Sequence, residues 1–532
     1  MKRNMRNLVA LAMLVVMLCA LVPAFAEDRV TFSTATFDMP PTLESSDEFS
    51  REGAPYYDVR WAYVLDMFNA KVEYYAYSYS TAQEQFRQMV NGGTLPDTMV
   101  CMLGSAEPRA YAEEGMIGLL PEGFEENYPN IKAMLDMIPI RDNFKLDGQY
   151  FSIPRGLETT EPFTDYDQVI FYRKDLAKAA GVEIKDVYTI DELYDMFAAV
   201  QAENPNMVMY SDIWPEDIRN IGLSEASPHF LYGKEWYKNE EGQYIYAWTQ
   251  PEALDGIQTF KRFYDAGFLR KEFFSDAAYE ARDQFSANQV FAYWDGLGMD
   301  FYNNVLNRYV SANPGAVVED IIGCAWISVL DGRLLGVQGG NTWSELYFSP
   351  EIVKDEEKLH LILSMYDYLH SSEGVRLQMY GLEGIHFELD DAGNVIDIRE
   401  KNPETGVPTP FNADHSIPDF IVVVMSGAFA DSSVLAANPA ISQYAKDEYR
   451  RLMDLRKDPA NLLVLPFDND IASFDGDLFR TAGDGLKPVN AIYKIIFENS
   501  AEDVPAAWAA WLSENQSIID QVAAEVNAAL AD

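Results

Sequence analysis

The chain has 532 residues, of which 48% are hydrophobic and 23% are charged, so it can bury the cores of more than one globular domain. Its 84 acidic residues outnumber the 40 basic ones, which gives a formal net charge of −44. Nucleic acids and anionic membrane surfaces are therefore excluded as partners, because both require a basic footprint.

The N-terminus has the pattern of a secretory signal peptide. Lys2, Arg3 and Arg6 precede an uncharged apolar run over residues 8–22, and a small-x-small site ends at Ala26. The run is shorter than the roughly 20 residues that a membrane span needs. We expect cleavage after Ala26, which leaves an even more acidic mature chain.

Cysteine positions raise two further questions. Cys19 would allow lipidation, but Leu18 stands before it where a lipobox carries Gly or Ala, so we expect a secreted chain at the extracellular face of the cell envelope. Cys101 and Cys324 lie in apolar surroundings. We expect two buried free thiols, with one disulfide as the alternative.

The elements that follow alternate between strand and helix. Hydrophobic periodicity predicts strands over residues 30–37, 72–79 and 98–103, with helices over residues 56–70 and from residue 80 to the Asn91-Gly92-Gly93 stop. The pattern S-x-x-Q at Ser80–Gln83 predicts a capping box, as does T-x-x-E at Thr189–Glu192. Such a β-α-β-α-β series is typical of a parallel sheet.

Residues 380–387 read YGLEGIHF and predict a helix C-cap followed by a tight turn into a strand. This element resembles one found in family 1 extracellular solute-binding proteins, the sugar receptors that feed ABC importers. Other segments resemble the family in the same order along the chain: NGGTLPDTMV (91–100), residues 114–120 with Tyr128-Pro129-Asn130, DGQYFSIPR (147–155) and IFYRKDLAKAAG (170–181). Together these segments span most of residues 30–390.

The resemblance implies an α/β, two-lobed, periplasmic-binding-protein-like (type II) fold with a hinge and an interlobe cleft. After the signal peptide, lobe I would comprise residues 27–164 plus about 338–435, and lobe II residues 168–337 plus about 436–532. The chain would cross between the lobes near Thr164–Gln168, near Leu334–Gly339 and once more between Phe387 and Ile441.

In that architecture the ligand lies between the lobes at the carboxyl ends of the strands. Thirteen per cent of the residues are aromatic, and aromatic faces stack on the C–H groups of sugars. From strand ends and crossings we predict the following ligand-binding residues: Tyr56, Tyr57, Trp61, Gly104, Ser105, Glu107, Arg155, Trp214, Trp294, Asp295, Asn341 and Trp343.

Many relatives carry an acidic, glycine-containing calcium loop after the helix that corresponds to residues 191–200. Here residues 201–209 read QAENPNMVM and lack the alternating oxygen ligands and the Gly turn of such a loop. Asp468, Asp470, Asp475 and Asp477 are the nearest substitute, but their irregular spacing is typical of a solvated loop. We expect no metal and no cofactor.

Catalytic motifs of the HExxH, GxSxG, P-loop and CxxC types are absent from the sequence. His360 lies in a helical segment and His386 lies within the turn motif, so we expect both to be structural. The resemblance therefore predicts a non-enzymatic, monomeric receptor that captures a carbohydrate, most simply an oligosaccharide, and delivers it to the permease subunits of an ABC transporter. The alternatives are a secreted glycoside hydrolase and a receptor for a non-sugar solute such as a peptide.

Overall fold

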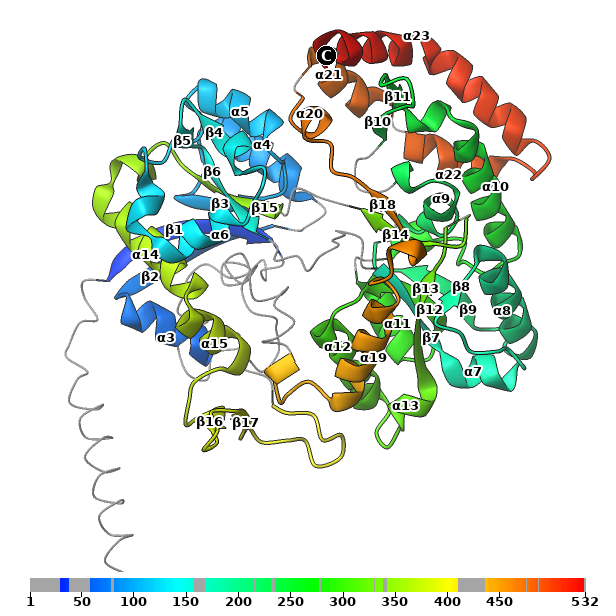
Figure 1. Cartoon of the computed structure of the whole chain (residues 1–532), viewed down its shortest axis with the longest axis horizontal. Coiled ribbons are helices and arrows are strands. Elements are labelled where there is room, and N and C mark those ends of the chain that lie inside the picture. The colour runs from blue at the N-terminus through cyan, green and yellow to red at the C-terminus, as the bar shows by residue number, and fades with distance from the viewer. Residues whose placement is uncertain are drawn as a thin grey trace, which may run out of the picture.

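The computed structural model describes residues 29–37, 58–77, 81–156, 168–214, 217–230, 235–276, 279–329, 331–337, 342–409, 436–474, 476–486 and 488–530. These residues form two lobes, each built around one five-stranded sheet (Figure 1). We name them lobe I and lobe II in the order in which the chain enters them. No helix in the described ranges is long and apolar enough to cross a membrane.

The sheet of lobe I has the strand order β2-β1-β3-β15-β6. Its strands in chain order are β1 (Val30–Phe37), β2 (Ala70–Tyr77), β3 (Thr98–Cys101), β6 (Ser152–Gly156) and β15 (Thr342–Phe348). β1 is parallel to β2 and β3, whereas β15 is antiparallel to β3 and β6. The predicted parallel series of the first three strands is confirmed, because helices carry the chain back between them.

Helices cover this sheet and enclose one apolar core. They are α3 (Val59–Met67), α4 (Ala82–Gly92), α5 (Ala106–Glu113), α6 (Pro129–Asp136), α14 (Glu356–His370) and α15 (Ser372–Tyr380). Short 3-10 turns are η2 (Phe124–Asn127), η3 (Arg141–Phe144) and η8 (Ile352–Lys354), and two small hairpins pair β4 (Lys145–Leu146) with β5 (Gln149–Tyr150) and β16 (Phe387–Leu389) with β17 (Val395–Asp397).

Two local predictions in lobe I have different outcomes. The turn after Tyr380 is confirmed, because Gly381 and Gly384 both have φ of 79° and the Leu382 N–H donates to His386 Nδ1 at 2.9 Å. The capping box predicted at the start of α4 is not tested, because its first residue, Ser80, lies outside the described residues. The helix has Thr81 as its N-cap residue, without a side-chain cap hydrogen bond, and Gln83 Nε2 donates to the Met102 carbonyl at 2.7 Å.

The sheet of lobe II has the strand order β8-β13-β7-β12-β9. Its strands are β7 (Gln168–Arg173), β8 (Val187–Tyr188), β9 (Val208–Asp212), β12 (Val290–Gly296) and β13 (Ile322–Ile327). β9 and β12 are parallel, whereas β7 is antiparallel to β12 and β13. Successive residues of the central strands point to opposite faces, so Trp294 joins one apolar core and Tyr293 joins the other.

The helices of lobe II include several that pack on the two faces of its sheet and others that pack against helices farther from the sheet. They are α7 (Lys174–Ala179), α8 (Ile190–Glu203), α9 (Asn220–Ala226), α10 (Pro251–Asp265), α11 (Glu280–Ser286), α12 (Met299–Ala312), α13 (Val318–Ile321), α19 (Gln443–Asp454), α20 (Asn469–Ala472), α21 (Asp477–Leu486), α22 (Pro488–Glu498) and α23 (Val504–Leu530). The predicted capping box of α8 is confirmed, with both Thr189 and Glu192 contributing.

Two small sheets and four 3-10 turns complete lobe II. They are β10 (Trp236–Lys238) with β11 (Tyr244–Tyr246), β14 (Leu334–Val337) with β18 (Leu462–Leu465), and η5 (Pro228–Phe230), η6 (Ala247–Thr249), η7 (Phe273–Ser275) and η9 (Pro459–Asn461). The parallel β14–β18 ribbon stands on the side of lobe II that faces lobe I in Figure 1.

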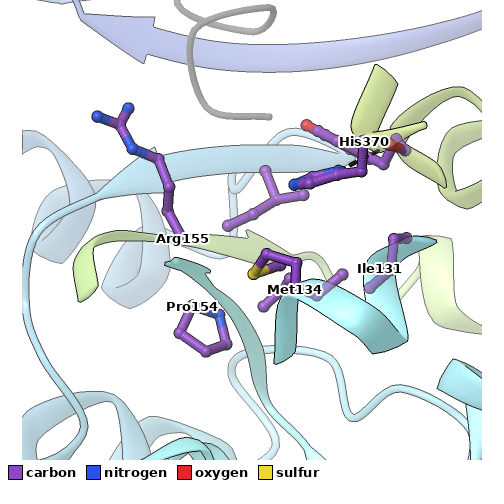
Figure 2. Close-up of a pocket in the computed structure, with 8 residues that line it drawn as sticks. Ile131, Met134, Pro154, Arg155 and His370 are labelled. Atoms are coloured by element: carbon purple, nitrogen blue, oxygen red, sulfur yellow. Dashed lines mark hydrogen bonds between the residues drawn. The ribbon is translucent and has the colours of Figure 1, made fainter. Parts of the chain in front are cut away.

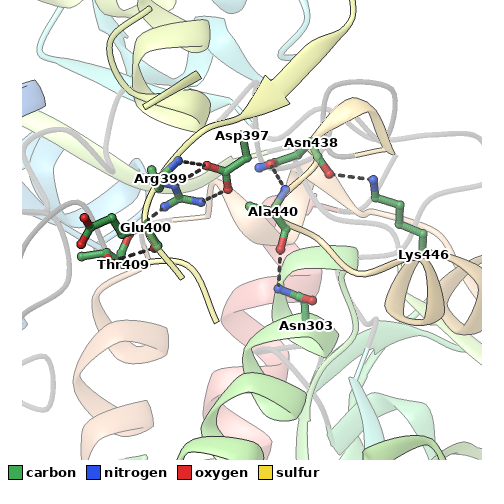
Figure 3. A network of polar contacts seen from close by, with 8 residues as sticks. All are labelled: Asn303, Asp397, Arg399, Glu400, Thr409, Asn438, Ala440 and Lys446. Atoms are coloured by element: carbon green, nitrogen blue, oxygen red, sulfur yellow. Dashed lines mark hydrogen bonds and ion pairs between the residues drawn. The ribbon is translucent and has the colours of Figure 1, made fainter. Parts of the chain in front are cut away.

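Polar contacts hold the chain on both sides of residues 410–435 (Figure 3). Before this stretch, Arg399 pairs with Asp397 at 2.7 Å and donates to the Thr409 carbonyl at 3.2 Å. After it, Asn303 of α12 donates to the Ala440 carbonyl at 3.3 Å, which ties the returning chain to lobe II.

The two cysteines in the described ranges are buried, and two of the histidines are hydrogen-bonded within lobe I. Cys101 in β3 and Cys324 in β13 are buried free thiols in different sheets, so the disulfide alternative is wrong. His360 Nδ1 is hydrogen-bonded to the Tyr128 hydroxyl at 2.8 Å, and His386 accepts the backbone bond described above. These contacts agree with a structural role for the two histidines, which stays a prediction.

Candidate functional site

The carboxyl ends of β9 and β12 lie next to each other at one edge of the lobe II sheet. The two strands are parallel, and Asp212 at the end of β9 is in register with Trp294 near the end of β12. Side chains that follow both strands therefore meet at the edge where open α/β sheets bind ligands.

An aromatic pair and an ion pair stand together at this edge. The ring of Trp214 lies 4.6 Å from that of Tyr279 in an edge-to-face arrangement, and the Arg282 guanidinium lies 4.6 Å from the Tyr279 ring centroid. Arg282 also donates two hydrogen bonds to Asp295, at 2.7 and 2.8 Å. We call Trp214, Tyr279, Arg282 and Asp295 the lobe II platform.

The backbone of Tyr279 is in the left-handed region, with φ of 64°. A tyrosine rarely adopts this conformation, and such residues cost of order 1–3 kcal/mol unless their surroundings hold them. Here the Tyr279 N–H donates to the Ile213 carbonyl at 2.8 Å, which fixes the ring beside Trp214. The strain is concentrated where the platform is assembled, and strained residues cluster at ligand sites.

Asp212 holds the turn that carries Trp214. One of its carboxylate oxygens accepts from the Trp214 N–H at 2.9 Å and the other from the Tyr210 hydroxyl at 3.3 Å. Burial raises the pKa of Asp212 well above its usual value, because loss of solvent penalises the charged carboxylate. Nearby, Arg219 pairs with Asp217 at 2.7 Å.

At the carboxyl end of β3, a buried carboxylate supports the turn that leads into α5. Glu345 of β15 accepts from the Leu103 N–H at 3.0 Å and from the Tyr347 hydroxyl at 3.1 Å, and the Gly104 backbone also bonds to it. Burial raises the pKa of Glu345 to about 7. Gly104 has φ of 67°, which glycine adopts without strain.

Glu107, at the start of α5, belongs to a small polar cluster. Arg87 donates to both of its carboxylate oxygens at 2.8 Å, and the Tyr111 hydroxyl donates at 3.0 Å. Burial alone would raise the pKa of Glu107, but the hydrogen bonds and charge of Arg87 lower it below the usual value. Arg480 of lobe II also lowers this pKa through its charge.

Contacts between the lobes occur near this cluster. Asn143 Nδ2 in lobe I donates to Asn469 Oδ1 in lobe II at 2.7 Å. Together with the charge interaction between Glu107 and Arg480, this bond brings the α20–α21 region against lobe I. On another part of the boundary, Met379 of α15 packs against apolar clusters of both lobes.

Arg155 lies at the end of β6 and is 6% exposed. It borders a cavity of about 10 Å³ whose other lining residues include Ile131, Met134 and His370 (Figure 2). Figure 2 shows its guanidinium pointing away from Met134 and Ile131. The cavity has room for about one water molecule, so it is too small to hold a sugar.

The structure separates the predicted site residues into three groups. The first group lies at the strand edges described above: Gly104, Ser105, Glu107, Arg155, Trp214 and Asp295. The second group is buried in cores: Trp61 is 0% exposed and donates to the Tyr74 hydroxyl, and Trp294 is 3% exposed. Both indoles therefore pack inside their lobes. The third group cannot be placed, because Tyr56, Tyr57 and Asn341 lie outside the described residues, as does the side chain of Trp343 in β15.

Sequence reasoning did not find Tyr279, Arg282 or Glu345. A left-handed tyrosine leaves no pattern in the sequence, and Arg282 is one of many arginines with acidic neighbours. The sequence did contain an indication of Glu345, because this is the one charged residue in the strand sequence TWSELYF. Within the described ranges, no group of three or more His, Cys, Asp and Glu side chains is arranged to hold a metal ion.

A family model of bacterial extracellular solute-binding proteins matches residues 61–318, from α3 to the start of α13. The matched residues make up just under half of the chain. The chain is 23% identical over 397 residues to the polygalacturonan/rhamnogalacturonan-binding protein YtcQ of Bacillus subtilis (strain 168), and the match covers 70% of this chain and 75% of that protein. Proteins of this family are solute-binding proteins of ABC transporters, and the predicted family and role are confirmed.

Solved structures agree on the fold. The alginate-binding protein AlgQ2, crystallised without calcium ion, has a TM-score of 0.64 at 16% identity, covering 94% of this chain and 98% of that chain. The ABC-transporter substrate-binding protein FusA of S. pneumoniae, an EF-hand mutant in complex with fructo-nystose, has a TM-score of 0.60 at 13% identity, covering 93% and 98%. The predicted two-lobed α/β fold is confirmed, and these relatives are binding proteins rather than enzymes.

Proposed function

We propose that this solute-binding protein captures a carbohydrate, most simply an oligosaccharide, and delivers it to the permease subunits of an ABC importer. The observation that carries the proposal is the lobe II platform, in which an aromatic pair stands beside a bidentate Arg282–Asp295 pair. Sugars present C–H groups to aromatic faces and hydroxyls to planar polar groups, and the platform offers both. The names of YtcQ and AlgQ2, which describe proteins that bind polysaccharides, support the same ligand class.

The proposed binding residues are divided between the lobes. In lobe II they are Trp214, Tyr279, Arg282 and Asp295, and in lobe I they are Gly104, Ser105, Glu107 and Arg155. Tyr56, Tyr57, Asn341 and Trp343 stay as predictions. We propose the lobe limits given by the sequence, residues 27–164 plus 338–435 and residues 168–337 plus 436–532, with the hinge at the crossings.

We further propose that the mature protein begins after Ala26, acts as a monomer outside the cell and catalyses no reaction. The Asp295 carboxylate is paired with Arg282 and Glu107 is paired with Arg87, whereas glycoside hydrolysis needs one carboxyl kept as an acid and a second as a nucleophile or base.

The test is a thermal-shift screen of the purified mature protein against oligosaccharides, followed by recovery of each stabilising sugar. A ligand with a Kd of about 1 μM raises the free energy of unfolding by about 4 kcal/mol at 1 mM. The sugar should be recovered unchanged after long incubation. Shorter products that form in proportion to protein concentration would identify an enzyme instead, and stabilisation by peptides alone would identify a receptor for a non-sugar solute.

A further inference from the structure

We infer that the ligand is an uncharged oligosaccharide rather than one that carries carboxylate groups, such as a uronate. This inference rests on the proposed carbohydrate function and narrows it. It concerns the charge of a ligand that the groups at the strand edges can bind. The proposed ligand differs from the polygalacturonan, rhamnogalacturonan and alginate that are named for YtcQ and AlgQ2.

Three arginines at or near the described strand edges are already engaged by carboxylates of the protein. Each has at least one nitrogen within 2.8 Å of its partner's carboxylate oxygen, and the pairs are Arg282 with Asp295, Arg87 with Glu107, and Arg219 with Asp217. A uronate carboxylate binds most strongly to a cation that is not already paired, because hydrogen bonds between two charged groups are about twice as strong as neutral ones.

Displacing one of these internal carboxylates by a ligand carboxylate is unfavourable. Asp295 is 2% exposed, so the loss of Arg282 would leave a buried charge without its partner. A sugar hydroxyl group can bind without breaking the ion pair. It can donate to a remaining lone pair of the carboxylate or accept from a remaining guanidinium N–H, and the ion pair stays intact.

The remaining groups at these edges point to the same class of ligand. Arg155 is 6% exposed, so its charge is largely enclosed by the protein. The faces of the Trp214 and Tyr279 rings carry negative quadrupole charge, which favours sugar C–H groups over carboxylates. Beyond the site, the net charge of −44 repels a polyanion as it approaches and slows its association.

Matched pairs of sugars test the inference. The purified mature protein is titrated calorimetrically with gluco-, galacto- and manno-oligosaccharides and with the corresponding oligouronates, which differ only by a carboxylate in place of the C6 hydroxymethyl group. We expect binding within the uncharged set, with the uronate of the same linkage at least ten-fold weaker. A change from 50 to 500 mM NaCl should alter the Kd of the uncharged ligand less than two-fold.

The outcomes separate this inference from the proposed function. A uronate that binds more tightly than its hydroxymethyl counterpart, with an affinity that falls steeply with salt, would overturn the inference and leave the carbohydrate function standing. If no member of either set binds, both the carbohydrate function and the inference are contradicted.

Discussion

The side-chain amide of Asn143 in lobe I donates to the side-chain oxygen of Asn469 in lobe II, with 2.7 Å between nitrogen and oxygen. The two residues are 326 positions apart in the chain. Because each belongs to a different lobe, the bond can persist only while these parts of the lobes stay together. It therefore reports on closure, the motion by which a two-lobed receptor gains contacts to both sides of its ligand.

Asn143→Ala should shift the lobes toward the open form. A hydrogen bond between exposed groups contributes about 0.5 to 1 kcal/mol, so the Kd for the ligand should rise about two- to five-fold. Small-angle scattering should show a larger radius of gyration without ligand. The control is Gln88→Ala, which removes a bond to Glu84 within one helix. Equal radii for both variants would show that the contact does not influence closure.

Trp214→Ala should weaken ligand binding by about 1 to 3 kcal/mol with a smaller effect on stability, because its half-buried ring offers one face of the platform. Trp511→Ala is the matched control. Trp511 is also half-buried, but it stacks on Trp508 in the C-terminal helix. Calorimetry and urea unfolding measure the two effects, and an unchanged affinity in a folded Trp214 variant would remove this residue from the site.

Trp294→Ala should act on stability. Its ring is 3% exposed and belongs to a core of lobe II, so its truncation should lower the free energy of unfolding by about 3 to 5 kcal/mol. Trp294→Phe should recover part of that loss because it leaves a smaller cavity. A folded alanine variant of normal stability that has lost its ligand would show instead that the indole contacts the sugar.

Glu345→Gln should remove a pH dependence of stability. Because burial raises the pKa of Glu345 from 4.5 to about 7, the folded state holds this proton more tightly than the unfolded state does. The contribution of the protonated group is thus fully present below about pH 4.5 and is lost as the pH rises through about 7, a change of about 3 kcal/mol.

Urea unfolding of the wild-type protein and of the Glu345→Gln variant between pH 4 and pH 8 measures this effect. The stability of the variant relative to wild type should increase across that window and level off above it. Parallel profiles would mean that Glu345 has an ordinary pKa. The binding affinity measured in the same buffers reports whether the turn at Leu103 and Gly104 contributes to the ligand site.

Sequence patterns predicted the parts of the fold that local chemistry determines. The strand Val30–Phe37 has its predicted limits, and the box formed by Thr189 and Glu192 is present, since each depends on residues a few positions apart. The order of short segments along the chain also predicted the family. The contact between the Gln83 side chain and the Met102 carbonyl, by contrast, joins residues that the local sequence pattern does not relate.

The candidate site was predicted less completely for a physical reason. In an apolar strand, a shift of one residue moves a side chain to the other face, so the sequence could not show that Trp294 points into a core while Asp295 meets Arg282. Tyr279 reaches Trp214 only through a left-handed backbone, which a tyrosine adopts because its amide bonds to Ile213. Such positions depend on tertiary contacts rather than on periodicity.

The most direct test of the proposed receptor function is calorimetric titration of the mature protein with the sugar that stabilises it most, followed by chromatography of the recovered sugar. We expect one saturable site per chain, an affinity reduced by Trp214→Ala, and a ligand that is chemically unchanged. Turnover of the sugar, or saturable binding that Trp214→Ala leaves unchanged, would contradict this function.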